Sequence, residues 1–524
     1  MTILGLGGLL NDPACAIMRD GRVVAAIEQK KLHRRFERGA FPAELIRETL
    51  RVAGVPPREV DTVAIARPFG TRGETRLHLS VRAMFPEARI APVEHHQSHA
   101  ASAFFASPFD RATVLTLDHS GDFRCGALWH GNGARLTLER ELYYPDSLGD
   151  LFSRVTELLG FHPRSDEHKV QWMSTAGTPT HAAAFLDHLN LTDGWPRVDL
   201  TAYDADRPGL GGFSAAFLDK LGITGDSALT EEQQRNLAAS VQHAVEQAVL
   251  SMAGEGENLC LAGGLAMNVL LIAALERSGR WKNVYVQPAA GNAGTALGAA
   301  WHAWHQLHGR RERHPLASLS LGPAYNPEDV KQILENCKLR FRYLLTTGEV
   351  IGAAVEQLAA DKIVAWMQGR MEFGPRALGN RSILASPLNP YSTENLNVFI
   401  KHREPFRKFA ASVPAELASQ YFDVGPNARF IATVGRVRDE HRETFASATL
   451  GDGLVRVHAV EESENPLFHR LLHTWGQKTK LPVLYNTSFN LFGDPLVCTP
   501  RDAVRSFYSS GVDAMIAGGF LLEK

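Results

Sequence analysis

Cysteine is scarce in this sequence. Its 524 residues include five cysteines, none of them in a Cys-x-x-Cys pair, and they are Cys15, Cys125, Cys260, Cys337 and Cys498. An odd number of scattered cysteines argues against a disulfide framework and against a zinc site made of thiolates. We therefore expect neither a disulfide-stabilised protein nor a protein with a zinc site made of cysteines.

Long apolar runs and a strong net charge are also missing. No stretch of about 18 apolar residues is present, so we expect no transmembrane helix. The first residues, Met-Thr-Ile-Leu-Gly-Leu-Gly-Gly, lack the basic and apolar regions of a signal peptide. A net charge of −2 provides no general attraction for nucleic acid or for an anionic membrane. We expect a cytoplasmic protein without a membrane partner, although a local basic patch for RNA is still compatible with the composition.

Two stretches of the N-terminal part have the same order of predicted elements. Residues 3–7, 14–18 and 23–27 are expected to be strands, with Asp20-Gly21 at a hairpin turn. Residues 113–117, 123–130 and 134–139 repeat the pattern of strand, polar loop and hairpin. This layout is typical of duplicated actin-like ATPase domains, whose loops present backbone N–H groups to an anion. Unrelated hairpins are the alternative, because hairpins are common.

Glycine-rich loops follow two predicted strands further along the chain. The strand at 258–262 ends in Gly263-Gly264, and the strand at 284–287 is followed by Gly291-Asn292-Ala293-Gly294 and a helix. Helix N-termini behind such loops bind anions, although ordinary strand–helix turns look the same in sequence. A chain of this length holds roughly two to four domains. We assign residues 1–345 to an N-terminal domain and residues 346–524 to a C-terminal domain.

The most informative segment covers residues 369–382, Gly-Arg-Met-Glu-Phe-Gly-Pro-Arg-Ala-Leu-Gly-Asn-Arg-Ser. It places Arg370, Arg376 and Arg381 within 12 positions, among glycines and a proline. The planar guanidinium group suits the oxygens of phosphates and carboxylates. We interpret the segment as a pocket for a small anion, and a structural salt-bridge cluster is the alternative.

A histidine pair indicates a metal site. His95 and His99 are four positions apart, so a helix here would place both on one face. Neutral imidazoles suit iron, zinc or manganese. Position 96 is histidine, so the glutamate of the His-Glu-x-x-His zinc proteases is missing and a metallopeptidase is excluded. A third ligand is needed, and Asp118, in the loop after the next strand, is the candidate.

Two polar segments near the C-terminus are candidates for pocket walls. Residues 401–407 read Lys-His-Arg-Glu-Pro-Phe-Arg, where the proline disfavours a long solvated helix. Residues 485–490 read Tyr-Asn-Thr-Ser-Phe-Asn directly after an apolar strand pattern. Amide and hydroxyl groups at the end of a buried strand are suited to hydrogen-bonding a ligand.

Together these features resemble the O-carbamoyltransferases of nodulation and antibiotic biosynthesis, the family that modifies nodulation factors, cephamycins and tobramycin. The resemblance spans nearly the whole chain and rests on five motifs in order, at residues 95–104, 261–268, 369–382, 401–407 and 482–490. It implies an α/β protein with a duplicated actin-like (ASKHA) N-terminal domain, similar to the tRNA threonylcarbamoyl transferase. It also implies a C-terminal α/β domain similar to threonylcarbamoyl-adenylate synthase.

The resemblance implies an ATP-dependent carbamoyltransferase. The C-terminal domain would take carbamoyl phosphate and ATP, with Mg²⁺, and form carbamoyl adenylate while releasing phosphate and pyrophosphate. In the N-terminal domain, a hydroxyl group of a small metabolite or sugar would then attack the intermediate, and AMP would leave. Transfer to a modified tRNA nucleoside and a nucleotide-binding relative with impaired transfer are the two alternatives. The sequence decides neither the acceptor nor whether the protein is a homodimer.

The matching motifs also imply roles for individual residues. Catalytic roles are implied for Arg376, Lys401, Arg407, Asn11 and Asp12. Binding of substrate or nucleotide is implied for Arg370, Arg456, Asn486, Ser488, Gly263, Gly264, Asn268, Glu167 and Lys169. A metal, Fe²⁺ or another divalent ion, would be held by His95, His99, Asp118 and Asn292.

Two departures from the family pattern concern the transfer domain. Where the family usually reads His-Asp-Ala-Ser, this chain reads Asn11-Asp12-Pro13-Ala14, and an amide cannot accept a proton at neutral pH. Where the family has an aspartate as the fourth metal ligand, this chain has Asn292, which removes one negative charge. We expect weaker or altered metal binding. The acceptor would be deprotonated by another group, such as His119 or Asp12, or catalysis would depend on the metal and on positioning.

Overall fold

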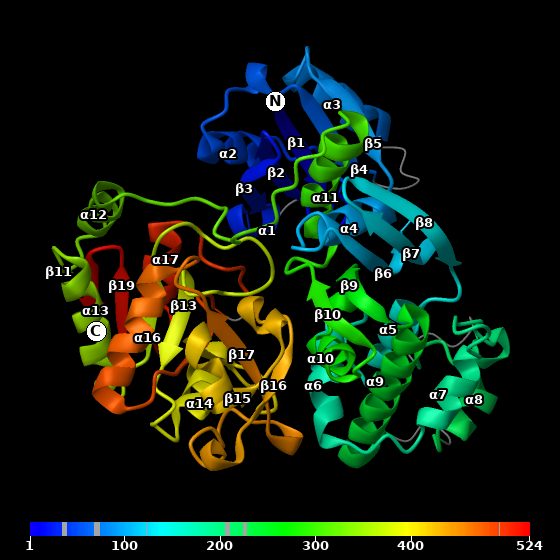
Figure 1. Cartoon of the computed structure of the whole chain (residues 1–524). Coiled ribbons are helices and arrows are strands. Elements are labelled where there is room, and N and C mark those ends of the chain that lie inside the picture. The colour runs from blue at the N-terminus through cyan, green and yellow to red at the C-terminus, as the bar shows by residue number, and fades with distance from the viewer. Residues whose placement is uncertain (34–38, 68–73, 122, 205–209, 224–227, 492) are drawn as a thin grey trace.

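The described part of the chain forms three β-sheets with helices packed on their faces (Figure 1). A computed structural model describes residues 1–33, 39–67, 74–121, 123–204, 210–223, 228–491 and 493–524. Two five-stranded sheets lie in the N-terminal part, and one ten-stranded sheet lies in the C-terminal part. Within the described residues, no helix is both long and apolar enough to cross a membrane.

The first sheet has the strand order β3-β2-β1-β4-β5. Its strands are β1 (Thr2–Gly7), β2 (Ala14–Arg19), β3 (Arg22–Glu28), β4 (Thr62–Ala66) and β5 (Arg89–Val93). β1 pairs with β2 in antiparallel and with β4 in parallel orientation. Successive side chains alternate between two cores, so Leu4 packs towards α2 (Ala43–Ala53) and α3 (Glu74–Met84), whereas Ile3 packs towards α4 (His95–Phe104) and α11 (Thr295–His302).

The second sheet repeats this topology, with the order β8-β7-β6-β9-β10. Its strands are β6 (Arg111–Gly121), β7 (Arg124–Asn132), β8 (Arg135–Tyr143), β9 (Gly256–Ala262) and β10 (Trp281–Val286). β6 pairs with β7 in antiparallel and with β9 in parallel orientation, as β1 does with β2 and β4. Helices α4 and α11 pack between the two sheets. The predicted duplicated, actin-like arrangement is therefore confirmed.

Helices cover the outer face of the second sheet. They are α5 (Leu148–Leu158), α9 (Glu231–Ala253) and α10 (Val269–Arg277), whose buried apolar residues share one core with β6, β7 and β9. Shorter helices surround this core: α6 (Glu167–Met173), α7 (Ala182–Leu189) and α8 (Ala215–Lys220). The N-terminal domain thus stacks helices and sheets in alternating layers.

The third sheet has the order β11-β20-β19-β12-β13-β18-β14-β17-β16-β15. Its strands are β11 (Arg342–Tyr343), β12 (Val364–Met367), β13 (Arg381–Ala385), β14 (Ala410–Pro414), β15 (Phe422–Asp423), β16 (Val434–Val437), β17 (Leu454–Val460), β18 (Leu484–Ser488), β19 (Ala514–Ala517) and β20 (Phe520–Glu523). Helices α13 (Thr347–Ala359) and α16 (Pro466–Thr479) pack on one face. Helices α12 (Pro327–Asn336) and α17 (Pro500–Tyr508) pack on the other, which confirms the α/β class.

The C-terminal unit begins before the expected boundary between residues 345 and 346. α12 buries Val330 and Leu334 in the core of the ten-stranded sheet, and β11 pairs with β20 at its edge. Residues 327–345 therefore pack with the C-terminal sheet, although the sequence assigned them to the N-terminal domain. The similarity of this sheet to threonylcarbamoyl-adenylate synthase stays a prediction.

Candidate functional site

A cavity of about 740 Å³ is lined by both domains. The N-terminal domain contributes polar and aromatic groups, including Asn11, Asp118, His119, Glu167, His168, Trp172, Gly264, Asn268 and Asn292. The C-terminal domain contributes Arg376, Arg403, Arg407, Lys408, Arg456, Asn486 and Ser488. One continuous space therefore connects the predicted metal site to the predicted anion site.

The metal end of the cavity is built where α4 meets β6. α4 begins directly after Glu94, whose side chain accepts a hydrogen bond from the His96 backbone N–H at 2.9 Å. His95 and His99 lie one turn apart on this helix and face Asp118 of β6. Their Nε2 atoms are 3.0 Å and 3.3 Å from Asp118 Oδ2. These three predicted ligands are therefore brought together.

The charge state of this cluster suits a divalent cation. Burial alone would raise the pKa of the Asp118 carboxyl, but the two imidazoles beside it hold that pKa well below its usual range. Burial lowers the pKa of His99, which favours the neutral form of its ring. His96 has a structural role, because its ring contacts Thr116 Oγ1 at 2.9 Å and the Arg124 carbonyl at 3.1 Å. An anionic carboxylate beside neutral imidazole nitrogen is what a metal requires.

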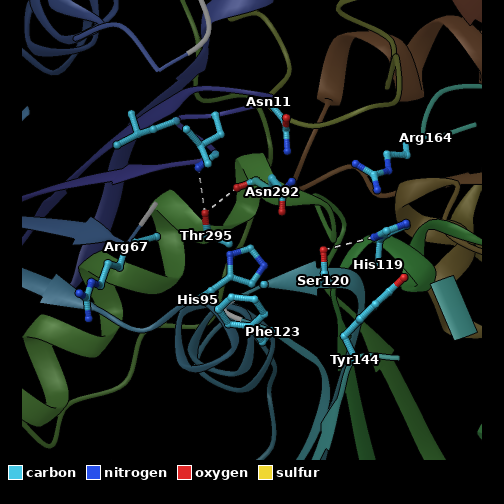
Figure 2. A pocket seen from close by; sticks show the side chains of 15 residues that line it. Asn11, Arg67, His95, His119, Ser120, Phe123, Tyr144, Arg164, Asn292 and Thr295 are labelled. Atoms are coloured by element: carbon cyan, nitrogen blue, oxygen red, sulfur yellow. Dashed lines mark hydrogen bonds between the residues drawn. The ribbon is translucent and has the colours of Figure 1, made fainter. Parts of the chain in front are cut away.

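Asn292 supplies a further oxygen at this end. It stands at the start of a short 3₁₀ helix (Asn292–Gly294) that leads into α11. Its backbone carbonyl accepts a hydrogen bond from Thr295 Oγ1 at 2.6 Å, and Gly8 N–H donates to the same hydroxyl at 3.2 Å (Figure 2). Its side-chain Oδ1 is buried and has no hydrogen-bond partner among the described residues. A buried, unpaired oxygen on a residue that lines the same cavities as His95 and Asp118 fits a divalent metal.

A second cavity, of about 540 Å³, adjoins the metal end (Figure 2). It shares several lining residues with the larger cavity: Asn11, His119, Ser120, Arg164 and Asn292. Its other walls include Arg67, His95, Phe123 and Tyr144. The His119 ring is oriented by Asp150, with 3.1 Å between Nε2 and Oδ1. This space therefore offers aromatic faces, amides and guanidinium groups next to the metal cluster.

The segment that carries Arg376 is fixed from two directions. The buried carboxylate of Glu372 accepts hydrogen bonds from three backbone N–H groups, those of Leu378, Asn380 and Arg381. From the N-terminal domain, Lys31 Nζ donates to the Glu372 carbonyl at 2.8 Å and to the Gly374 carbonyl at 2.7 Å. Arg376 is therefore held at the junction of the domains, where it lines the large cavity.

Four arginines concentrate positive charge at this end of the cavity. Burial and the neighbouring Arg407 lower the pKa of Arg376 to about 10 and the pKa of Arg403 to about 9. Burial and the other three arginines lower the pKa of Arg456 well below its ordinary value. Glu404, 3.6 Å from Arg407, and Asp166 are acidic neighbours of this cluster. Such an excess of buried cations is suited to a ligand with several phosphate charges.

The remaining walls at this end come from both domains. The Arg456 guanidinium lies over the Trp172 ring, 4.5 Å from its centroid. Asn486 donates through Nδ2 to the Ala377 carbonyl at 3.2 Å and to Ser412 Oγ at 3.1 Å. Its Oδ1 is buried without a hydrogen-bond partner in the described part of the chain. Asn486 therefore presents a free acceptor at the cavity, where Ser488 is also placed.

The two arginines that flank Arg376 in sequence do not line either cavity. Arg370 donates to three backbone carbonyl groups, those of Val24, Leu321 and Gly322. Arg381 is fully buried and donates to the Gln368 and Pro323 carbonyls. Arg370 therefore has a structural role in place of the predicted substrate contact, and the salt-bridge alternative fails because the partners are carbonyl groups.

Lys401 and Lys169 are engaged by protein groups and line neither cavity. Lys401 Nζ donates to Asn490 Oδ1 at 2.6 Å and also to the Ser488 carbonyl, so it supports the cavity wall from behind. Lys169 lies 3.3 Å from Asp166 and 3.2 Å from Glu404, so it links α6 to the C-terminal domain. The predicted direct contacts of these lysines with substrate are not supported by this placement.

In the N-terminal domain, Asp12 and Gly263 also lie away from the cavity lining. Asp12 Oδ2 forms an ion pair with Lys30 Nζ at 3.0 Å. Gly263 adopts a φ of +99° and packs against the backbone of Leu117, where a Cβ would overlap the carbonyl oxygen. Gly263 therefore shapes the turn, and its neighbour Gly264 reaches the cavity.

Asn268 and Glu167 do line the cavity, but both make internal contacts. Asn268 caps α10, with Oδ1 accepting from the Leu270 and Leu271 N–H groups at 3.1 Å. Glu167 accepts a hydrogen bond from Ser153 Oγ at 2.7 Å. Their predicted contact with a nucleotide stays a prediction.

Arg403, His168 and Trp172 line the large cavity and were not among the predicted site residues. Arg403 lies inside the 401–407 segment, which the sequence predicted as a pocket wall. The sequence did not indicate that the Arg403 side chain faces the cavity. His168 and Trp172 belong to α6. His168 lies between the predicted residues Glu167 and Lys169, whereas no motif covered Trp172. His168 Nε2 is buried without a hydrogen-bond partner among the described residues, and burial with the nearby Arg407 lowers its pKa to about 4.

Comparison with known proteins gives two family matches and several relatives. Residues 73–301 match the family described as Carbamoyltransferase N-terminus, and residues 355–524 match Carbamoyltransferase C-terminus. A protein of Synechocystis sp., sll1178, is 34% identical over 100% of this chain and 96% of its own length. Nodulation protein NolNO of Sinorhizobium fredii is 32% identical over 98% of this chain and 79% of its own. The 3'-hydroxymethylcephem-O-carbamoyltransferase of Amycolatopsis lactamdurans is 31% identical over 50% of this chain and 48% of its own.

Proposed function

This chain belongs to the carbamoyltransferase family of enzymes, and we propose that it is an ATP-dependent O-carbamoyltransferase that works through carbamoyl adenylate. The observation that best supports the proposal is the cavity shared by the domains. Four arginines at one end can bind phosphates, and a metal-ligand cluster lies at the other. An intermediate made at the first end could reach the second without leaving the protein.

In the first step, carbamoyl phosphate and ATP react at the arginine end. Atom balance requires one water: the carbamoyl group loses phosphate, and the carbamate oxygen displaces pyrophosphate from the α-phosphorus of ATP. Negative charge accumulates on the transferring phosphoryl group and on the departing pyrophosphate, normally shared with Mg²⁺. Arg376, Arg407 and Arg456 would stabilise that charge, because a guanidinium in a dry site holds phosphate oxygens strongly. Asn486 Oδ1 would accept a hydrogen bond from the carbamoyl NH₂ group.

In the second step, an acceptor hydroxyl attacks the carbamoyl carbon. A C–O bond to the acceptor forms, the C–O bond to AMP breaks, and one proton is released. A divalent metal bound by His95, His99, Asp118 and Asn292 would supply a Lewis acid at the carbonyl or at the leaving phosphate. The smaller cavity would hold the acceptor, with Phe123 and Tyr144 offering ring faces to a sugar or small metabolite.

The first test is whether the intermediate forms. Purified protein is incubated with ATP, Mg²⁺ and carbamoyl phosphate, and carbamoyl adenylate is sought by mass spectrometry beside a pyrophosphate assay. We expect pyrophosphate release that depends on carbamoyl phosphate, and a loss of about 10²–10³-fold in Arg376→Ala. Arg501→Ala, which removes an exposed arginine of α17, is the matched control and should keep the wild-type rate.

The results separate three cases. Formation of the adenylate that survives in Arg376→Ala would contradict the assignment of the arginine end. Absence of any adenylate in the wild type would contradict the proposed reaction. A third outcome is that the adenylate forms but carbamoylates none of a panel of hydroxylated acceptors. This outcome would favour the alternative of a relative with impaired transfer, which the presence of Asn11 and Asn292 suggests.

A further inference from the structure

A second cluster of metal-ligating side chains lies in the C-terminal domain, outside the lining of both cavities. His469 and His473 are one turn apart on α16, and Glu416 lies in a short 3₁₀ helix (Ala415–Leu417) directly after β14. The Glu416 carboxylate is 3.0 Å from His469 Nε2 and 2.6 Å from His473 Nε2. Two imidazoles from one helix and a carboxylate from another element therefore converge on one point.

The spacing of these atoms is close to that of a zinc site. Zn–N and Zn–O bonds of about 2.0–2.1 Å in a tetrahedron put neighbouring ligand atoms about 3.3 Å apart. One candidate ligand atom from each of the three residues lies within 4.8 Å of the others. An ion could therefore enter with small side-chain movements and no change in the backbone.

We propose that Glu416, His469 and His473 bind a divalent transition-metal ion of the zinc class, with water at the remaining position. Neutral imidazole and carboxylate form a borderline donor set that suits Zn²⁺, Co²⁺ and Ni²⁺ and is less suited to Mg²⁺ or Ca²⁺. The side chain of His469 is 11% exposed, whereas those of His473 and Glu416 are 38% and 51% exposed. The anchored imidazole fixes the position of the ion, and the exposed pair leaves it accessible from solvent.

The ion would connect α16 to the end of β14, and α16 also supports the arginine segment. At the start of α16, Asn465 donates to the Asn380 side chain at 2.9 Å and to the Leu378 carbonyl at 3.3 Å. Phe468 packs directly on Gly379, where a Cβ would overlap its ring. The metal is therefore a structural link that holds the helix behind the segment carrying Arg376, and it takes no part in the chemistry.

The competing explanation of the Glu416, His469 and His473 cluster is an ordinary surface ion pair. The chain contains such a pair elsewhere, which can serve as a comparison. His130 of β7 pairs with Glu139 of β8, and both side chains are at least half exposed. No second histidine joins this pair among the described residues. His130 therefore provides a matched control, because it is an exposed histidine beside a carboxylate without the third ligand.

The test measures zinc bound by the full-length protein in equilibrium dialysis. His473→Ala and Glu416→Gln should each bind one equivalent fewer than the wild type, or bind it at least about tenfold more weakly. His130→Ala should bind as much as the wild type. Wild-type stoichiometry retained in both His473→Ala and Glu416→Gln would overturn the proposal.

A second measurement does not depend on a variant that folds. Diethyl pyrocarbonate modifies accessible imidazoles, and peptide mass spectrometry reports the modification of each histidine. Added Zn²⁺ should protect His473 in the wild-type protein and leave His130 reactive. Equal modification of His473 with and without Zn²⁺ would contradict the site, whatever the zinc content at His95 and His99.

Discussion

The two ends of the shared cavity differ in how their charges are balanced. At the metal end, the Asp118 carboxylate lies between two imidazoles, so the group is paired before any ligand arrives. At the arginine end, burial and mutual repulsion lower the pKa of Arg376, Arg403 and Arg456, and the nearby carboxylates of Glu404 and Asp166 offset this positive charge only in part. The charges of the metal end are therefore balanced within the protein. The positive charge of the arginine end is balanced only when a ligand with several negative charges binds.

The largest expected effect comes from a substitution that disrupts only the arginine end. Arg456→Ala should slow pyrophosphate release that depends on carbamoyl phosphate by about 10²–10³-fold, because it removes a buried donor from the phosphates. Transfer from added carbamoyl adenylate should change much less. Arg456→Lys should recover little activity, since ammonium cannot combine a planar fork with stacking on Trp172. Equal losses in both half-reactions would show that the two ends are not separable.

The next largest effect is expected from a substitution that disrupts the metal end. Asp118→Asn should lower carbamoyl transfer by about 100-fold, because outer-shell changes alone cost about 10–100-fold in metal affinity or activity. Carbamoyl adenylate should still form, and it should accumulate in quenched samples followed by mass spectrometry. His130→Ala is the control for unrelated histidine–carboxylate pairs and should leave both steps unchanged. Loss of adenylate formation in Asp118→Asn would contradict the division of labour.

The duplicated topology was accessible from sequence, but the domain boundary was not. Alternating apolar residues and the Asp20-Gly21 turn are local signals, and they predicted the repeated hairpins that the two sheets contain. The position of residues 327–345 depends on long-range pairing. β11 has only two residues, and its partner β20 lies at the far end of the chain. No local pattern identifies which sheet such a strand joins.

The same limit applies to the site. Arg370 and Arg376 lie six positions apart in the same segment, yet one binds backbone carbonyl groups and the other lines the cavity. The backbone of the segment is held by Glu372 and by Lys31, which lies more than 300 positions away. The His95 and His99 pair was predictable because both ligands come from one helix turn. Trp172 reaches Arg456 only through the packing of one domain on the other.

A smaller effect tests the internal carboxylate that shapes the arginine end. Glu372→Gln should lower the free energy of unfolding by about 2–3 kcal/mol, since a buried carboxylate that accepts three backbone N–H groups becomes a weaker acceptor. Chemical denaturation of the full chain, followed by tryptophan fluorescence, measures the change. Glu394→Gln, an exposed glutamate of the same domain, should stay near the wild-type value. Equal stabilities of the two variants would contradict the role of Glu372.

The smallest effect concerns the pH dependence of stability at the arginine end. Burial and Arg407 lower the pKa of His168 to about 4 in the folded protein, against an ordinary value of 6.5. Between these values the unfolded chain binds a proton that the folded chain does not, so stability falls as the pH is lowered from 6.5 towards 4. The slope is proportional to the number of protons that the unfolded chain binds in excess of the folded chain. His168→Gln should lower that number by at most one. Other buried histidines, such as His188 and His302, contribute to the remaining slope.

Urea titrations at several pH values between 4 and 7 give this slope for the wild type and for His168→Gln. The slope should be flatter in His168→Gln than in the wild type. Bound pyrophosphate should also flatten the wild-type slope, because it neutralises the arginines that oppose protonation of His168. A slope that neither the substitution nor the anion changes would mean that His168 does not sense the arginine end.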